Sequence, residues 1–277
     1  MRASIIIPSH NRYSFLQALL ASLTSTIDDS DVEIIVVDDG STDGTAEHLA
    51  VDFPGLRLLS VPTVRGPSYG RNRGADAAQG DLLLFLDSDG VVEEGWLDAL
   101  LHADSGRHVL LGNVVDFHGG RTQSVPRRAT FIGKSLPCRP ERANTGPSCN
   151  LAVPRDLFQA LGGFDEELPY YFEDSDLCIR VACAGHPFRF VADAVFRHHG
   201  TEQKTDDAIR LQEAHSTYAM LKAYEDDILR SVAFSLANGT WLLTRAVWWT
   251  ARGRLDDVAL LLRGWGSAYV RYLRARY

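Results

Sequence analysis

Leu82-Leu83-Leu84-Phe85-Leu86-Asp87-Ser88-Asp89-Gly90 is a run of five apolar residues that ends in two carboxylates one residue apart. The run predicts a strand buried on both faces of a parallel sheet. Because positions i and i+2 of a strand face the same side, Asp87 and Asp89 should project together at the edge where open α/β sheets bind ligands. Two such oxygen donors suit Mg²⁺ or Mn²⁺ carrying phosphate oxygens. The alternative is an acidic turn, since Asp, Ser and Gly are common turn residues.

Strand-like and helix-like segments alternate through the part of the chain that leads to this run. Strands are predicted at residues 4–7, 33–37, 56–61 and 81–86, and helices at residues 13–23, 45–51 and 67–78. Ser41 or Thr42 is predicted to cap the second of these helices. The alternation indicates right-handed βαβ units on a mostly parallel central sheet flanked by helices, and therefore an α/β fold.

The pattern is less regular after the acidic pair. Helices are predicted at residues 94–102, 155–161 and 173–184, and strands at residues 109–117, 151–153 and, as one or two short pieces, 188–196. Residues 118–147 are rich in Gly, Pro, Arg and Lys without periodicity, which predicts a long loop. From residue 205 onward the pattern is helical throughout.

Bulk properties exclude several classes of protein. A net charge of −8 disfavours a nucleic-acid-binding protein, which relies on clustered Lys and Arg. The four cysteines have neither zinc-ligand spacing nor a disulfide framework, so a reducing, cytoplasmic compartment is expected. No signal peptide or run of about 20 apolar residues is present, so no spanning helix is predicted.

The C-terminal region has an unusual composition. Four of the five tryptophans lie after residue 240, and residues 245–277 hold seven Arg against two acids, a local charge of +5. Aromatic residues mixed with Arg on helices are typical of segments in a membrane interface. The same residues serve protein interfaces, so contact with the cytoplasmic membrane surface and a homodimer both remain open.

Polar motifs stand at several predicted strand ends and helix starts. They include Pro8-Ser9-His10-Asn11-Arg12, Asp38-Asp39-Gly40-Ser41, Arg71-Asn72-Arg73-Gly74, Gly162-Gly163-Phe164-Asp165-Glu166, Glu173-Asp174-Ser175-Asp176 and His198-His199. With Asp87-Ser88-Asp89 they make roughly residues 1–200 resemble the nucleotide-diphosphate-sugar transferases of glycosyltransferase family 2, of the Asp-x-Asp type. The resemblance implies a GT-A fold over residues 1–204, with a nucleotide-sugar half at about 1–117 and an acceptor half at about 118–204. A helical region at 205–277 would follow.

On the donor side, the resemblance implies that residues 8–12 wall the base and ribose, with Pro8, Ser9, His10 and Arg12 as contacts. Asp39 would accept a hydrogen bond from a ring N–H of the base, and a UDP-sugar is the favoured donor. Arg71 would screen the diphosphate; an exposed arginine at a helix end is the alternative. Structural roles are expected for Asp38 and Ser41 in a turn or cap, for Asn72 and Gly74 in a turn, and for Asp176 and Arg180 as an i, i+4 pair.

The resemblance also implies a divalent cation, Mn²⁺ or Mg²⁺. Asp89 would bind it directly, Asp87 would touch the metal or the ribose, and Ser88 would line the same nucleotide-sugar site. His198 would be a further ligand, with His199 as the fallback. Adjacent strand residues face opposite ways, so only one of the two histidines should reach the metal.

For the acceptor side, Asp174 is implied as the general base and Glu173 as its neighbour, with Asp165 and Glu166 bordering the acceptor. The loop from residue 121 to 142 holds six basic residues against Glu141. It would close over the diphosphate or meet a phosphorylated acceptor, or it is simply solvated.

The function implied is an inverting, metal-dependent glycosyltransferase acting on a hydroxyl of a glycan, a lipid-linked or a small-molecule acceptor. A sugar-phosphate nucleotidyltransferase should carry a Gly-rich phosphate loop after its first strand, but residues 8–12 hold no glycine. A non-catalytic nucleotide-sugar-binding protein would be favoured by loss of Asp174 or of the acidic pair, and both are present. A dinucleotide oxidoreductase is disfavoured because no G-x-G-x-x-G follows the first strand.

Overall fold

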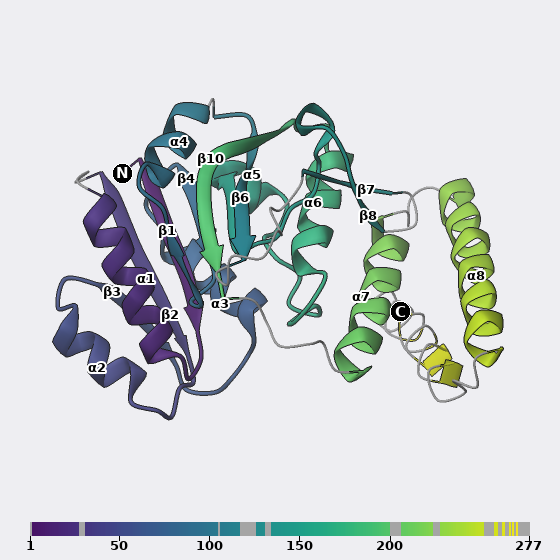
Figure 1. Ribbon diagram of the computed structural model, residues 1–277, viewed down its shortest axis with the longest axis horizontal. Coiled ribbons are helices and arrows are strands. Elements are labelled where there is room, and N and C mark those ends of the chain that lie inside the picture. The colour runs from purple at the N-terminus through teal and green to yellow at the C-terminus, as the bar shows by residue number, and fades with distance from the viewer. Residues whose placement is uncertain are drawn as a thin grey trace. The chain divides into compact units, whose positions relative to one another are not determined.

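The computed structural model describes residues 2–27, 31–104, 106–116, 126–130, 134–199, 206–223 and 228–251, and seven residues between 258 and 270 (Figure 1). The contacts divide the chain into two compact units. The first comprises Met1–Arg128 and Pro137–Gly200, and the second comprises Ala129–Leu136 and Thr201–Tyr277.

The first unit is built on an eight-stranded sheet in the order β3-β2-β1-β4-β9-β6-β10-β5. Its strands are β1 (Ala3–Ser9), β2 (Val32–Asp39), β3 (Arg57–Val61), β4 (Leu82–Leu86), β5 (Gly90–Val92), β6 (Val109–Asp116), β9 (Asn150–Pro154) and β10 (Phe188–His198). Strands β3, β2, β1 and β4 run parallel, and β9 is antiparallel to both of its neighbours. Strand β10 pairs parallel with β6 and antiparallel with β5. The predicted α/β fold with a mostly parallel central sheet is confirmed.

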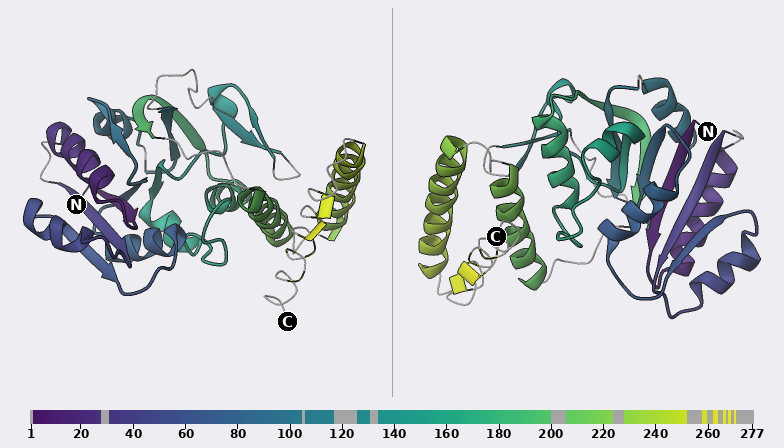
Figure 2. Two further views of the ribbon diagram at one scale, coloured as in Figure 1. Left: turned by 60° about the horizontal axis from the view of Figure 1, so that its bottom comes forward. Right: turned by 180° about the vertical axis from the view of Figure 1, so that it is seen from behind.

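Helices cover both faces of this sheet (Figures 1 and 2). They are α1 (Tyr13–Thr26), α2 (Thr45–Asp52), α3 (Pro67–Ala77), α4 (Trp96–Ala103), α5 (Arg155–Ala160) and α6 (Glu173–Cys183), with a short 3₁₀ helix η1 (Pro140–Arg142). Apolar residues of α1, α2 and α4 pack on one face, and those of α3, α5 and α6 pack on the other. Strand β4 alternates between the two cores: Leu84 and Leu86 join the first, Leu83 and Phe85 the second. Its apolar run is therefore buried on both faces, as the sequence predicts.

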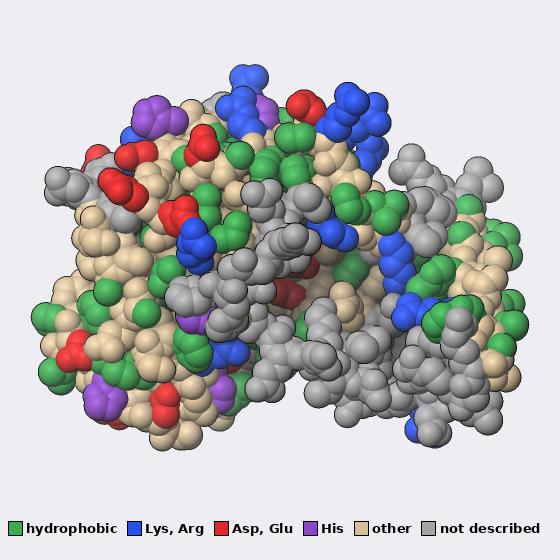
Figure 3. Space-filling view, in the orientation of Figure 1, with side chains coloured by type: hydrophobic (Ala, Val, Ile, Leu, Met, Phe, Trp, Pro, Cys, Tyr) green, Lys and Arg blue, Asp and Glu red, His purple; other side chains and the backbone are tan. Residues whose placement is uncertain are grey.

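The second unit contains two long helices, α7 (Asp206–Ala223) and α8 (Ile228–Thr250). The inner face of α8 buries Phe234, Asn238 and Leu242. The Asn238 side-chain amide donates to Thr217 Oγ1 of α7 over 3.3 Å, so these two helices pack together. Hydrophobic side chains also lie along the outer edge of α8 (Figure 3). Among the described residues, no helix combines the length and apolarity needed to cross a bilayer.

The structure corrects the predicted secondary structure in two places. Residues 118–147 were expected to be one loop, but they include η1 and a two-stranded sheet of β7 (Arg127–Ala129) and β8 (Ser135–Pro137); residues 117–125 and 131–133 lie outside the described part. Strand β5 was not predicted at all. Residues 188–198 form one strand with a register shift between Val191 and Val195. Strands of three residues are too short to show a period, which is why β5, β7 and β8 escaped detection.

Gly74 offers a test of how closely α3 approaches the sheet. A Cβ at this position would collide with Ile6 Cγ2 of β1 and lie 3.3 Å from Val37 Cγ2 of β2. Gly74→Ala should therefore lower the free energy of unfolding by about 1–3 kcal/mol, measured by urea denaturation. Gly55→Ala is the matched control, because its Cβ would meet nothing within 4 Å. Equal stability of the two variants would contradict this packing.

Candidate active site

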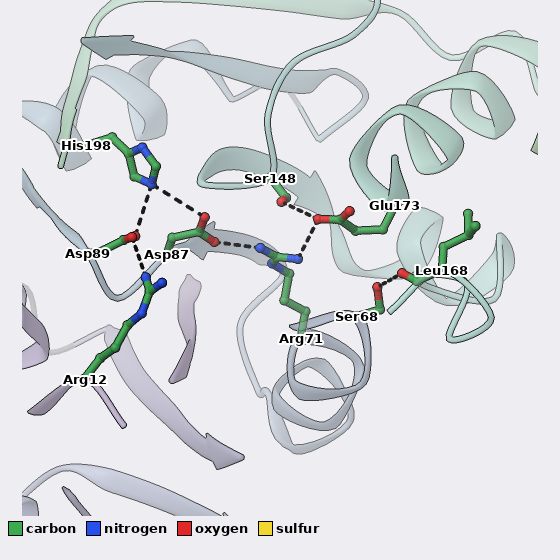
Figure 4. A network of polar contacts seen from close by, with 9 residues as sticks. All are labelled: Arg12, Ser68, Arg71, Asp87, Asp89, Ser148, Leu168, Glu173 and His198. Atoms are coloured by element: carbon green, nitrogen blue, oxygen red, sulfur yellow. Dashed lines mark hydrogen bonds and ion pairs between the residues drawn. The ribbon is translucent and has the colours of Figure 1, made fainter. Parts of the chain in front are cut away.

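Three potential metal ligands meet at the carboxyl edge of the sheet. Asp87 and Asp89 follow the end of β4, and His198 is the last residue of β10, paired with Gly90 of β5. This register brings His198 Nε2 to 3.1 Å from Asp89 Oδ1 and 3.9 Å from Asp87 Oδ2 (Figure 4). One ligand atom from each residue lies within 4.8 Å of the others. Two carboxylates and an imidazole at this spacing fit a divalent cation such as Mn²⁺.

The two adjacent histidines have different surroundings. The His198 side chain belongs to the cluster, whereas the His199 ring contacts Phe15 edge-on, with centroids 5.0 Å apart. The His199 backbone N–H donates to the Asp89 carbonyl oxygen over 2.9 Å. The structure thus places the side chain of His198, and not that of His199, in the group with Asp87 and Asp89.

Two basic side chains contact the carboxylate of Asp89. Arg12, the residue that precedes α1, forms an ion pair with Asp89 Oδ2, while His198 contacts the other oxygen. Burial acts to raise the pKa of Asp89, but His198 and Arg12 together outweigh it and lower this pKa. For His198, burial acts to lower the pKa, and Asp89 and Asp87 outweigh it and raise this pKa. Ser88, which stands between the two aspartates in the sequence, is also buried.

Arg71 of α3 is buried, with 2% of its side chain exposed. One guanidinium nitrogen lies 2.6 Å from Asp87 Oδ1, and another lies 3.1 Å from Glu173 Oε1. The Ser148 hydroxyl also donates to this Glu173 oxygen, over 3.3 Å. The alternative of an exposed arginine at a helix end is therefore wrong: Arg71 joins the acidic pair to the start of α6 (Figure 4).

Glu173 and Asp174 open α6 after two residues with unusual backbone angles. Tyr171 and Phe172 have φ values of 62° and 72°, in the left-handed region that bulky residues rarely adopt. Burial and the neighbouring Asp174 raise the pKa of Glu173 to about 7. Burial also raises the pKa of Asp174, against the hydrogen bonds from Ser175. Strained backbone and carboxyls with raised pKa values together are typical of a functional site.

The loops after β1 and β2 are bonded to each other. Asn11 N–H donates to Ser41 Oγ over 2.9 Å, and Thr42 N–H donates to Asn11 Oδ1 over 2.7 Å. The cap predicted at Ser41 or Thr42 is therefore wrong, because α2 starts after Gly44 and these residues hold Asn11 instead. His10 Nδ1 lies 2.8 Å from the Asp39 carbonyl oxygen and ties the same two loops.

The carboxylate of Asp39 binds a third loop, the one that precedes α3. Its two carboxylate oxygens accept hydrogen bonds from the backbone N–H groups of Arg65 and Gly66, at 2.9 and 2.7 Å. Each oxygen keeps a second lone-pair site, so the predicted contact with a base stays a prediction. Ser9 Oγ at the end of β1 and Asp38 Oδ1, its register partner on β2, are buried without a hydrogen-bond partner in the described part of the chain.

Asn72 has a role that the sequence did not reveal. Its side-chain amide donates to the Phe164 carbonyl oxygen over 2.9 Å and accepts from the Phe164 N–H over 2.8 Å. It also contacts Glu166, 3.2 Å away. Asn72 thus ties α3 to the turn that carries Asp165 and Glu166, which are half-buried and exposed respectively. No local pattern signals such a contact, because its partner is far away in the sequence.

Two other expectations concern α3 and α6. The predicted pair of Asp176 and Arg180 is confirmed, with an N···O distance of 2.6 Å. The turn expected at Asn72 and Gly74 is wrong, because both residues lie inside α3, and at Gly74 the sheet leaves no room for a side chain.

Known proteins match this chain in sequence and in fold. The pattern of Glycosyl transferase family 2 matches residues 4–161, and the chain belongs to this family. Glycosyltransferase AglE of Haloferax volcanii is 30% identical over 203 residues, which cover 70% of this chain and 66% of AglE.

Solved structures show the same fold. The mannosyltransferase PcManGT from Pyrobaculum calidifontis, in complex with GDP-Man and Mn²⁺, has a TM-score of 0.60 at 19% identity; the match covers all of this chain and 88% of PcManGT. S. aureus TarS 1-349 in complex with UDP has a TM-score of 0.61 at 22% identity, over all of this chain and 93% of TarS 1-349. The GT-A fold that the motifs implied is confirmed.

The pH dependence of stability tests the buried carboxyl of Glu173. Since folding raises the pKa of Glu173 from 4.5 to about 7, the folded state binds this proton more tightly than the unfolded chain. Wild type should therefore lose free energy of unfolding as the pH rises from 4.5 to about 7, and Glu173→Gln should lose less. Urea denaturation at several pH values measures both.

Glu94→Gln is the control for this comparison, because Glu94 is an exposed glutamate of the same unit. Its stability should follow the pH dependence of wild type. Identical pH dependence of wild type and Glu173→Gln would show that folding does not change the pKa of Glu173.

Proposed function

We propose that this protein is an inverting glycosyltransferase that moves a sugar from a nucleotide-diphosphate-sugar to a hydroxyl acceptor. The observation that carries the proposal is the cluster of Asp87, Asp89 and His198, joined through Arg71 to the start of α6. This cluster supports the proposal because it would supply cation ligands for a leaving diphosphate, near carboxyls whose pKa values are raised. Membership of glycosyl transferase family 2 supports the same reaction class.

The donor would lie along the carboxyl ends of β1, β2 and β4. Pro8, Ser9 and His10 border this edge, and Asp39 offers acceptor sites to a ring N–H of the base. The unpartnered oxygens of Ser9 and Asp38 support a polar ligand here, because buried polar groups are normally hydrogen-bonded. A UDP-sugar is the donor that we favour.

Asp87, Asp89 and His198 would hold Mn²⁺ or Mg²⁺, and the ion would supply Lewis-acid stabilisation of the departing diphosphate. Arg12 is 43% exposed and already contacts Asp89, so it provides a second cation for phosphate oxygens at the same edge. Ser88 would complete this side of the nucleotide-sugar site. Arg71 is engaged by two carboxylates, so its expected action on the diphosphate would be indirect, through Asp87.

Asp174 would act as the general base. It would take the proton of the acceptor hydroxyl while that oxygen bonds to the anomeric carbon and the bond from this carbon to the diphosphate oxygen breaks. Attack from the side opposite the leaving group inverts the anomeric configuration. A carboxyl whose pKa is raised by burial is suited to this task, because it is a stronger base than a carboxylate in water. Asp165, Glu166 and Glu173 would border the acceptor.

A donor screen tests the function directly. The full chain is incubated with UDP- and GDP-sugars, with and without Mn²⁺, and release of nucleoside diphosphate is measured. We expect release from at least one donor, most strongly from a UDP-sugar with Mn²⁺. Tight donor binding without release or transfer would instead support a non-catalytic nucleotide-sugar-binding protein.

Asp174→Asn tests the base. The variant should keep donor affinity and lose roughly 10² or more of the rate, since proton transfer by a positioned base contributes about that much. Asp156→Asn is the control, because it changes an exposed acid at the start of α5. Full activity of Asp174→Asn would remove Asp174 as the base.

His198 and His199 provide a matched pair for the metal site. Calorimetric titration of UDP with Mn²⁺ should show affinity reduced by roughly tenfold or more in His198→Ala and in Asp89→Ala, because each loses a ligand. His199→Ala should retain the affinity of wild type, since its ring contacts Phe15 and the group of potential ligands in the described residues comprises Asp87, Asp89 and His198. Unchanged affinity in both Asp89→Ala and His198→Ala would refute the metal assignment.

A further inference from the structure

Helix α8 has an exposed apolar face as well as a buried one. Val232, Leu236, Leu243 and Val247 recur at spacings of four, seven and four residues, which places them on one side of the helix. Their exposed fractions are 54%, 68%, 67% and 69%. We call these four residues the α8 stripe; it extends over about 22 Å of helix, at a rise of about 1.5 Å per residue.

The opposite side of α8 is already buried, in part by α7 and in part by a small cluster of Leu242 with Trp241 and Val258. Phe234 and Leu242 are buried there, and Asn238 bonds to Thr217. A helix that is apolar on both sides is stable only when both sides are covered. Within the described part of the chain, the α8 stripe stays more than half exposed at each of its four residues.

Polar groups near the stripe are adapted to an apolar surrounding. The sequence of α8 holds no ionisable residue between Arg230 and Arg245. The hydroxyls of Thr240 and Thr244 donate to carbonyl oxygens of the helix itself, those of Leu236 and Trp241, both over 2.8 Å. Neither hydroxyl therefore needs water as an acceptor, which lowers the cost of entering a medium without hydrogen-bonding groups.

The charge of the C-terminal region distinguishes between the two candidate partners of the α8 stripe, a second copy of the chain and a lipid bilayer. Residues 245–277 carry a net charge of +5, while the whole chain carries −8. A second copy of the chain, paired through the same face, would offer the arginines no complementary acid, because the sequence of α8 holds no Asp or Glu. An anionic bilayer surface instead offers apolar chains to the stripe and negative headgroups to the arginines, with Trp248 suited to the boundary.

We propose that α8 is an interfacial anchor: the α8 stripe inserts into the surface of a bilayer that contains anionic lipid, without crossing it. The proposal commits to a lipid surface and not to a second copy of the chain. It is independent of the proposed function, because its readout is vesicle binding and not sugar transfer.

Vesicle flotation of the full chain tests this proposal. Phosphatidylcholine vesicles with added phosphatidylglycerol should carry the protein upward, and phosphatidylcholine alone should carry less. The double variant Leu236→Ser/Leu243→Ser should lose at least about tenfold of the partitioning, because it removes apolar groups without changing charge. Val51→Ser, at a 78% exposed position of α2, should bind like wild type.

A second measurement keeps the test decisive if the double variant folds poorly. Lipids brominated along their acyl chains should quench tryptophan fluorescence of the wild-type chain on anionic vesicles. Absence of flotation and quenching in wild type, or equal partitioning of the double variant and wild type, would overturn the proposal. A dimer seen by static light scattering without lipid, and lost in the double variant, would assign the stripe to a second copy instead.

Discussion

A buried guanidinium is the interaction on which the rest of the site depends. Arg71 of α3 binds Asp87, which follows the next strand β4, and Glu173 at the start of α6, 102 residues away in the sequence. A charge with 2% exposure is tolerable only while its partners remain, and loss of one partner of such a pair costs about 3–5 kcal/mol. The three elements are thereby held in one arrangement, with Asp87 on one side of Arg71 and Glu173 on the other.

The site as a whole is a chain of alternating charges. Arg12 and His198 hold Asp89, Asp87 lies beside His198 and Arg71, and Arg71 continues to Glu173. Each carboxylate of the acidic pair is thus oriented before any ligand arrives, which is the preorganisation that binding and catalysis require. The arrangement costs conformational free energy at the start of α6, because Tyr171 and Phe172 adopt left-handed backbone angles there.

Prediction from sequence succeeded where a long pattern had one physical cause. Strand β4 shows an unbroken apolar run because helices cover both of its faces, and α1 shows helical spacing because one side packs on the sheet. It failed where an element was too short, as in β5, or where a polar side chain served a distant partner. Ser41 and Asn72 are such polar side chains. They bond to Asn11 and Phe164, and no pattern in the residues around them indicates these bonds.

The sequence by itself determined the α/β class, the acidic pair at the end of a buried strand, the family motifs and the helical character of the C-terminal region. These are local properties, because periodicity and residue type act within a few positions of each other. Only the tertiary structure decided that His198 and not His199 faces Asp89, and that Arg71 is buried between two carboxylates. Strand register and burial make those choices, and both depend on elements that meet only when the chain has folded.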